Sequence, residues 1–169
     1  MNKKISEMLN AQVNKEFYSA YLYLSFANYF IELGLNGFAS WYQVQAQEER
    51  DHATLMVQFL QNNDEKVVYE AIAKPDGFWA QGSDVLKAGL AHEQYVTDSI
   101  HKIYDAASDV KDYRTLQFLD WFVKEQGEEE KNATELIRKM ELFGSDAKSL
   151  YMLDQELAAR TYAPPSLVL

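Results

Sequence analysis

The chain has 169 residues, about the length of one domain, and 47% of them are hydrophobic, which is enough for one packed core. It contains only 7 glycines and 3 prolines, a composition typical of an all-helical protein. Its formal net charge of -10 argues against nucleic acid as a partner and permits cations. The absence of cysteine excludes disulfides, zinc–thiolate sites and iron–sulfur clusters, and it fits a reducing cytoplasm.

Residues 17–30 form an uncharged, aromatic-rich run that has to be compared with a membrane span. This run of 14 residues is too short to cross a bilayer, and it sits inside an amphipathic pattern. Residues 1–4 resemble the start of a signal peptide, but Lys15 and Glu16 break any apolar region that follows. We therefore expect a buried helix here, a cytoplasmic protein and no membrane partner.

A first helix is predicted over residues 4–33. Its apolar residues recur at steps of three and four, and Glu16 falls within the same stripe. Gly34 and Gly37 then separate this helix from the next one.

A second helix is predicted over residues 38–61, with Glu49 and His52 on one face. Residues three apart share a face of a helix, so this E-x-x-H step can bring both side chains to one metal ion. By itself the step is a weak signal, because solvated helix faces often carry glutamate and histidine.

The third and fourth helices are predicted over residues 83–107 and 112–143. Glu93 is in phase with the apolar residues of the third helix, and Gln126 and Glu129 are in phase with those of the fourth. Both helices therefore place polar side chains where apolar ones are expected.

A short fifth helix is predicted over residues 146–159, and Pro164 and Pro165 then favour an extended end. The chain is thus expected to be a single domain with three parts. These are a helical bundle over 1–145, a short C-terminal helix over 146–160 and an extended tail over 161–169.

The lengths of the connections predict the topology. The first and second helices, and likewise the third and fourth, are joined by short loops, so each pair is expected to be antiparallel. The connection over residues 62–82 has about twenty residues, and at roughly 3.3 Å each these can cover a helix of roughly 42 Å. The prediction is an all-α four-helix bundle with one long crossover and a short fifth helix.

Four glutamates, one on each long helix, fall within apolar stripes. Stripping water from a carboxylate costs several kcal/mol, and these stripes hold no lysine or arginine that offsets the charge. A pair of metal ions is the simplest source of positive charge, and carboxylates with one imidazole suit iron, manganese or zinc. The alternative, four polar residues tolerated at stripe edges, requires the same coincidence on four helices.

With these features, the chain resembles a prokaryotic non-haem ferritin over essentially its whole length. The resemblance implies a ferritin-like fold and a homo-oligomeric shell of twenty-four subunits. The motifs that carry it are KEFY at 15–18, QEERDH at 47–52, HEQ at 92–94 and WFVKEQGEEE at 121–130.

The resemblance also implies a di-iron ferroxidase centre inside the bundle. Glu16 and His52 belong to the first iron, Glu93 and Glu129 belong to the second, and Glu49 bridges the two. The full set implied for the pair is Glu16, Glu49, His52, Glu93, Gln126 and Glu129.

Further residues are implied around this pair. By resemblance, Tyr23 and Trp121 sit beside the irons, where they can hydrogen-bond a ligand or supply an electron, although each is also explained as a core aromatic. The family's third iron site, on the inner-cavity side, corresponds to Glu48, Glu125, Glu128 and Glu129.

Two related families are disfavoured by particular residues. Bacterioferritin carries a second E-x-x-H step where this chain has Gln126 and Glu129, and a haem-binding methionine where it has Arg50, so no haem is expected. Rubrerythrin-like peroxidases carry cysteine pairs, which this chain lacks.

The predicted function is therefore iron storage, with Fe(II) oxidised by O₂ or H₂O₂ and ferric mineral deposited inside the shell. Two alternatives stay open. One is a di-iron carboxylate oxidase or peroxidase that retains its metals, although such enzymes usually complete both E-x-x-H steps. The other is a metal-buffering bundle without redox turnover.

Overall fold

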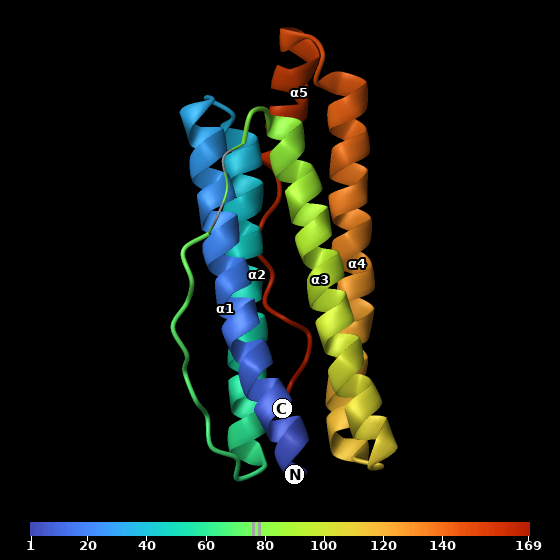
Figure 1. Ribbon diagram of the computed structural model, residues 1–169. Helices are drawn as coiled ribbons and strands as arrows, with labels where there is room; N and C mark the ends of the chain where they lie inside the picture. Colours follow the sequence, from blue (N-terminus) through green and yellow to red (C-terminus); the bar gives the residue numbers. More distant parts are fainter. Residues whose placement is uncertain (76, 78) are drawn as a thin grey trace.

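The computed structural model describes residues 1–75, 77 and 79–169, so positions 76 and 78 of the predicted long connection lie outside the described residues. Over the described residues the chain forms five α-helices and no strand (Figure 1). They are α1 (Lys3–Glu32), α2 (Asn36–Asn62), α3 (Gly82–Asp109), α4 (Tyr113–Phe143) and α5 (Ala147–Leu157). All five predicted helices are confirmed, with ends within two residues of the predicted bounds.

The four long helices form a bundle with one long crossover, as predicted. α1 packs against α2 and α3 packs against α4, and a short turn joins the members of each pair. The connection from α2 to α3 runs along the length of the bundle, so α2 and α3 point in the same direction (Figure 1). Within the described part of the chain, no helix has the length and apolarity that a membrane span needs.

Two asparagines of α1 hold the connection against the bundle. The Asn10 side chain donates to the carbonyl oxygen of Lys66 at 3.0 Å and accepts from the N–H of Val68 at 2.7 Å. Asn14 donates to the carbonyl oxygen of Ala71 at 3.2 Å. These bonds satisfy backbone groups of a segment that has no helix or sheet of its own, and they keep it beside α1.

The short helix α5 packs across one end of the bundle, against α2 and α4. Its buried Asp154 accepts hydrogen bonds at Oδ1 from the backbone N–H groups of Gly37, at 2.7 Å, and Phe38, at 3.0 Å. A carboxylate at this place satisfies free N–H groups at the start of α2 and complements the helix dipole. Gly37 is needed for the approach, because a Cβ there would lie 1.7 Å from the carbonyl oxygen of Asp154.

The apolar core is divided into two clusters along the bundle axis. The first comprises buried residues within 5–13, 55–60, 96–107 and 118–122. The second comprises buried residues within 22–30, 38–46, 85–86 and 136–157. The level between the clusters is occupied on each long helix by a buried glutamate: Glu16, Glu49, Glu93 and Glu129.

Candidate metal centre

Three side chains from two helices converge at the level between the clusters. Glu16 lies on α1, and Glu49 and His52 lie one turn apart on α2. One ligand atom from each lies within 4.8 Å of the other two. Among the described residues, this is the one group of three or more histidines, aspartates or glutamates that meets at such a spacing.

Each member of this group has a buried polar atom without a hydrogen-bond partner among the described residues. These atoms are Glu16 Oε2, Glu49 Oε1 and His52 Nδ1. A buried polar atom left unpaired costs roughly 1–3 kcal/mol and is rare in folded proteins. Two carboxylate oxygens and an imidazole nitrogen are the donor set that iron, manganese or zinc accepts. The group is therefore chemically suited to hold one such ion.

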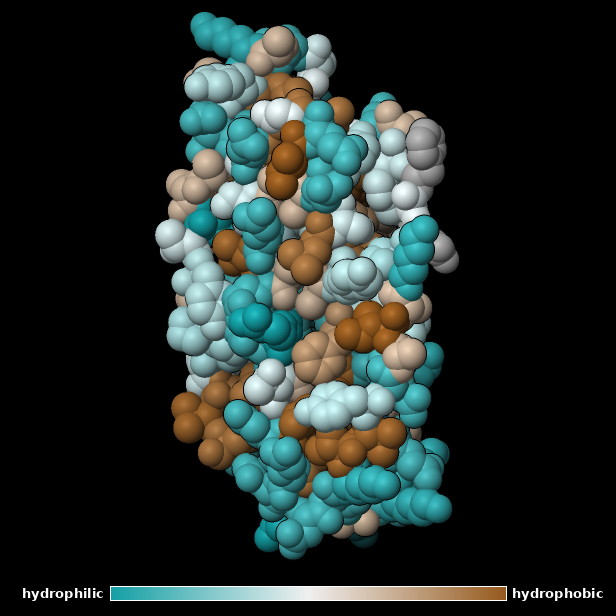
Figure 2. All heavy atoms as spheres, turned by 90° about the vertical axis from the view of Figure 1, so that its left-hand side faces the viewer, coloured by the Kyte–Doolittle hydropathy of each residue, from teal (hydrophilic) through white to brown (hydrophobic). Residues whose placement is uncertain are grey.

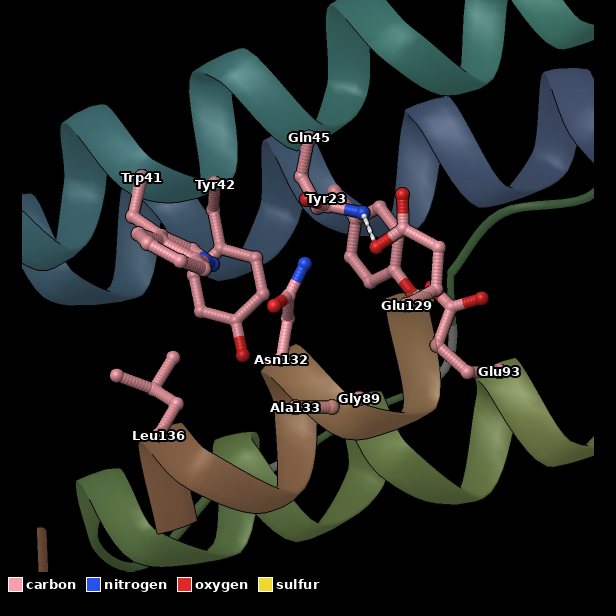
Figure 3. A pocket seen from close by; sticks show the side chains of 10 residues that line it. All are labelled: Tyr23, Trp41, Tyr42, Gln45, Gly89, Glu93, Glu129, Asn132, Ala133 and Leu136. Carbon is pink, nitrogen blue, oxygen red and sulfur yellow. Dashed lines mark hydrogen bonds between the residues drawn. The ribbon is translucent and has the colours of Figure 1, made fainter. Parts of the chain in front are cut away.

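Glu93 and Glu129, on α3 and α4, are held by neighbouring side chains. Tyr23 donates to Oε1 of Glu93, and the Gln126 amide donates to Oε2 of the same carboxylate at 3.1 Å. The Gln45 amide of α2 donates to Oε2 of Glu129 at 2.7 Å, as Figure 3 shows. The structure thus brings Tyr23 and Gln126 to Glu93 and Gln45 to Glu129, but it does not gather these two carboxylates with Glu16, Glu49 and His52 at the ligand spacing of that group.

Sequence reasoning missed two glutamines at this centre. Gln12 donates to Oε1 of Glu16 at 2.9 Å, and Gln45 donates to Glu129. Both amides are buried. The signal that points to them is spacing, because Gln12 precedes Glu16 by four residues and Gln45 precedes Glu49 by four, which places each pair on one helix face.

Burial raises the pKa of all four glutamates, and repulsion from neighbouring glutamates raises it further for Glu49, Glu93 and Glu129. Burial is the largest cause for each, and it raises the pKa of Glu93 to about 7 and that of Glu129 to about 8. The pKa of Glu49 lies well above its usual value because the charges of the other three glutamates add to burial. These raised pKa values favour protonated carboxyl groups near neutral pH, and a cation that bound here would have to displace those protons.

The four acids implied for a third iron site are not gathered in the same way. Glu48 is paired with Arg160, whose Nη2 lies 2.5 Å from Glu48 Oε2. Glu128 is exposed and pairs with Lys124 of its own helix at 3.5 Å. Glu125 is half-buried, and burial raises its pKa.

A small cavity of about 20 Å³ adjoins the centre. Glu93, Glu129 and Tyr23 line one end, and Trp41 and Leu136 line the other (Figure 3). Its volume is sufficient for roughly one water molecule. The centre thus has room beside its carboxylates for a ligand of that size.

The Trp121 ring packs edge to face against the His52 imidazole, with the ring centres 5.5 Å apart. Its indole Nε1 points away and donates to Ser166 Oγ at 2.9 Å. Trp121 therefore separates His52 from the C-terminal tail.

Comparison with known proteins places these features in a family. The family model for the ferritin-like domain matches residues 6–143. The chain is 36% identical to a bacterial non-heme ferritin of Staphylococcus saprophyticus over 162 residues, covering 96% of this chain and 97% of the relative. It is 35% identical to a bacterial non-heme ferritin of Campylobacter jejuni, covering 92% and 93%.

Solved structures give the same result. An open-pore ferritin from the hyperthermophilic archaeon Archaeoglobus fulgidus superposes with a TM-score of 0.93 at 41% identity, covering 95% of this chain and 99% of that one. A humanized archaeal ferritin superposes with a TM-score of 0.95, also at 41% identity, covering 97% and 99%. On its sequence, its fold and the residues between its two core clusters, this chain belongs to the ferritin family.

Proposed function

We propose that the protein is an iron-storage ferritin that oxidises Fe(II) at the centre between its two core clusters. The first iron binds Glu16, Glu49 and His52, and Glu49 bridges to a second iron held by Glu93 and Glu129. The observation that carries this proposal is the set of three partnerless buried atoms on Glu16, Glu49 and His52. The ferritin relatives over almost the whole chain support the same function.

The residues of the centre suit both binding and oxidation of iron. Two Fe(II) ions each give one electron, and the two electrons reduce O₂ to H₂O₂ or H₂O₂ to water. Anionic oxygen ligands favour the more highly charged Fe(III) product, and displacement of protons from Glu93 and Glu129 makes those oxygens available. Tyr23 and Gln126 orient Glu93 for this role, and Tyr23 is also near enough to supply an electron.

Storage requires a container, and we propose a homo-oligomeric shell of twenty-four subunits located in the cytoplasm. The face that carries α1 and the long connection shows apolar side chains in several groups (Figure 2). Exposed large apolar residues of these two segments are Tyr21, Leu24, Ile31, Val68, Tyr69 and Ile72. Exposed apolar surface of this kind is typical of a face that contacts another subunit.

The alternative of a di-iron enzyme that retains its metals is less well supported. Such enzymes usually have a second histidine three residues after a helix-borne glutamate. Here α4 has Gln126 and Glu129, and the Gln126 amide donates to Glu93. A native mass of a small oligomer, rather than a large shell, is the measurement that favours the alternative.

The test is to mix metal-free protein with Fe(II) in air and to follow the absorbance of Fe(III). We expect oxidation to be much faster than in buffer alone, and the product to stay in solution with the protein. An oxidation rate equal to that of the buffer blank refutes the ferroxidase proposal.

A further inference from the structure

The C-terminal tail folds back over the bundle. Residues 160–167, which we call the strap, run from the end of α5 toward the end of the bundle where α1 begins (Figure 1). Tyr162 Oη donates to Asp51 Oδ2 of α2 at 2.6 Å, and Trp121 Nε1 of α4 donates to Ser166 Oγ at 2.9 Å. Leu167 packs against the first core cluster. The strap therefore contacts both α2 and α4 beside the metal centre.

Arg160 begins the strap and makes its strongest contact. Its Nη2 donates to Glu48 Oε2 at 2.5 Å, and the two side chains are only 17% and 19% exposed. Its guanidinium lies 4.1 Å from the centre of the Trp41 ring. Partial burial strengthens an ion pair relative to an exposed one, and the aromatic face adds a cation–π contribution.

Glu48 of α2 is near enough to Glu125 and Glu129 of α4 to interact with their charges. It is the neighbour of Glu49 in the sequence, and its charge raises the pKa of Glu129. The charge of Glu125 in turn raises the pKa of Glu48, and Arg160 opposes that effect. A carboxylate in this position attracts cations, and in the structure the cation that it binds is the guanidinium of Arg160.

We propose that Arg160 occupies the cation position at Glu48, so that a third metal ion binds there only after the strap releases this carboxylate. Arg160 is then the residue that sets the affinity of the outer position, and it does not touch the di-iron pair. The inference rests on the proposed function for the identity of the cargo. Arg160 then competes with the metal ion for the Glu48 carboxylate of the same chain.

The test is calorimetric titration of the assembled, metal-free protein with Zn²⁺, which binds the same donors as iron without being oxidised. For the parent we expect two tight sites per subunit and a much weaker third. Arg160→Gln should strengthen the third site by roughly tenfold or more, because a positive charge next to Glu48 is removed. The two tight sites should keep their affinity.

Three further variants sharpen the test. Tyr162→Phe removes the bond to Asp51 but keeps Arg160, so it should strengthen the third site to a smaller extent. Adding Glu48→Gln to Arg160→Gln should abolish the gain. Lys139→Gln removes an ion pair of equal length, 2.5 Å to Glu156, at a distance from Glu48 in the sequence and outside the strap, and should leave the titration unchanged.

The outcomes separate this inference from the proposed function. A parent protein that binds no Zn²⁺ tightly refutes the di-iron centre and the inference with it. Two tight sites, with an unchanged third site in both Arg160→Gln and Tyr162→Phe, overturn the role of Arg160 and leave the centre standing. If Arg160→Gln fails to fold, Tyr162→Phe decides, because it removes a bond that holds the strap without changing any charge. An unchanged third site in Tyr162→Phe then overturns the inference.

Discussion

Glu49 differs from the other glutamates of the centre in how it is held. Each of the others accepts a hydrogen bond from a glutamine amide, whereas Glu49 receives none from the amides of the described residues, and its Oε1 has no partner. A carboxylate oxygen that accepts a hydrogen bond is oriented by its donor, and that bond uses part of its capacity to accept. A carboxylate oxygen without a donor keeps its full capacity to bind a cation. This is the arrangement expected of a bridging ligand.

Glu49→Gln should therefore slow Fe(II) oxidation more than any other single change at the centre. The substitution keeps the shape of the side chain but removes a charge shared by both irons. We expect a loss greater than roughly 100-fold, the upper end for losing a group that merely supports a ligand. Stopped-flow absorbance of Fe(III) measures it, with Glu135→Gln, an exposed acid of α4, as the control. A parent-like rate in Glu49→Gln contradicts the assignment.

A chain of hydrogen bonds supports Glu16 from outside the centre. Lys15 Nζ donates to Ser99 Oγ at 2.5 Å, Ser99 donates to Gln12 Oε1 at 2.6 Å, and Gln12 donates to Glu16 at 2.9 Å. The chain fixes which way the Gln12 amide faces, because its oxygen is engaged by Ser99. Gln12 is therefore a positioning residue for Glu16.

Gln12→Leu should weaken binding of the first metal ion by roughly 10-fold to 100-fold, the range for a group that orients a ligand. The second ion should be affected less, since its proposed ligands Glu93 and Glu129 have donors of their own. Zn²⁺ titration of the metal-free protein measures both affinities. Gln47→Leu, which removes a partly buried bond to Asp51, serves as the matched control. Equal effects of the two substitutions would falsify the role given to Gln12.

For individual residues, the sequence indicated the buried glutamates of the centre but not the glutamines that hold them. A glutamate in an apolar stripe is unusual enough to be noticed, so Glu16, Glu49, Glu93 and Glu129 were found. A glutamine such as Gln12 carries no charge and is unremarkable at a helix position. Spacing places Gln12 beside Glu16, but Ser99, which orients the Gln12 amide, and Glu129, the acceptor of Gln45, lie on other helices, and spacing along one helix does not reveal them.

At the scale of the elements, the long helices were predictable and the strap was not. Periodicity of 3.6 residues, together with glycines at the ends, locates a helix from local sequence alone. The strap has no period, and its contacts join Arg160 to Glu48 and Ser166 to Trp121 across long stretches of chain. The sequence predicted an extended tail there, but nothing in it indicated that the tail returns to the bundle.

The docking of α5 depends on one carboxylate at the start of α2. Asp154→Ala should destabilise the protein by about 1–2 kcal/mol, because the Gly37 and Phe38 N–H groups lose their acceptor. For a subunit of this size we expect a fall in melting temperature of about 2–4 °C per kcal/mol. Asp154→Asn keeps an acceptor oxygen and should lose less. An unchanged melting temperature in Asp154→Ala would show that α5 docks through its apolar residues alone.

At the scale of the whole molecule, the fold is built around a layer of buried acids that oppose folding when no metal is bound. The two core clusters above and below this layer supply the apolar burial that stabilises the bundle. The layer itself is stabilised by protons or by cations. The bundle was predictable from helical periodicity and the lengths of the connections, and the family from the motifs that contain these glutamates.

The layer makes the stability of the metal-free protein depend on pH. Glu93 and Glu129 have pKa values of about 7 and about 8 in the folded protein, against 4.5 as the model value for a free glutamate. A raised pKa means that the folded state binds the proton more tightly than the unfolded state. Below pH 4.5 these glutamates are protonated in both the folded and the unfolded state, so their charges do not destabilise the fold. As the pH rises toward 8, the unfolded state gives up its protons first and is favoured.

We therefore expect the melting temperature of the metal-free protein to fall between about pH 5 and pH 8, and Zn²⁺ to restore it most strongly at pH 8. The combined substitution Glu93→Gln and Glu129→Gln should flatten this slope, because neutral amides do not titrate. Glu135→Gln with Glu141→Gln removes two charges outside the centre and should keep the parental slope, which separates buried repulsion from the effect of net charge. A melting temperature that rises over this range, or a slope unaffected by the buried pair, would mean that the acid layer does not strain the metal-free fold.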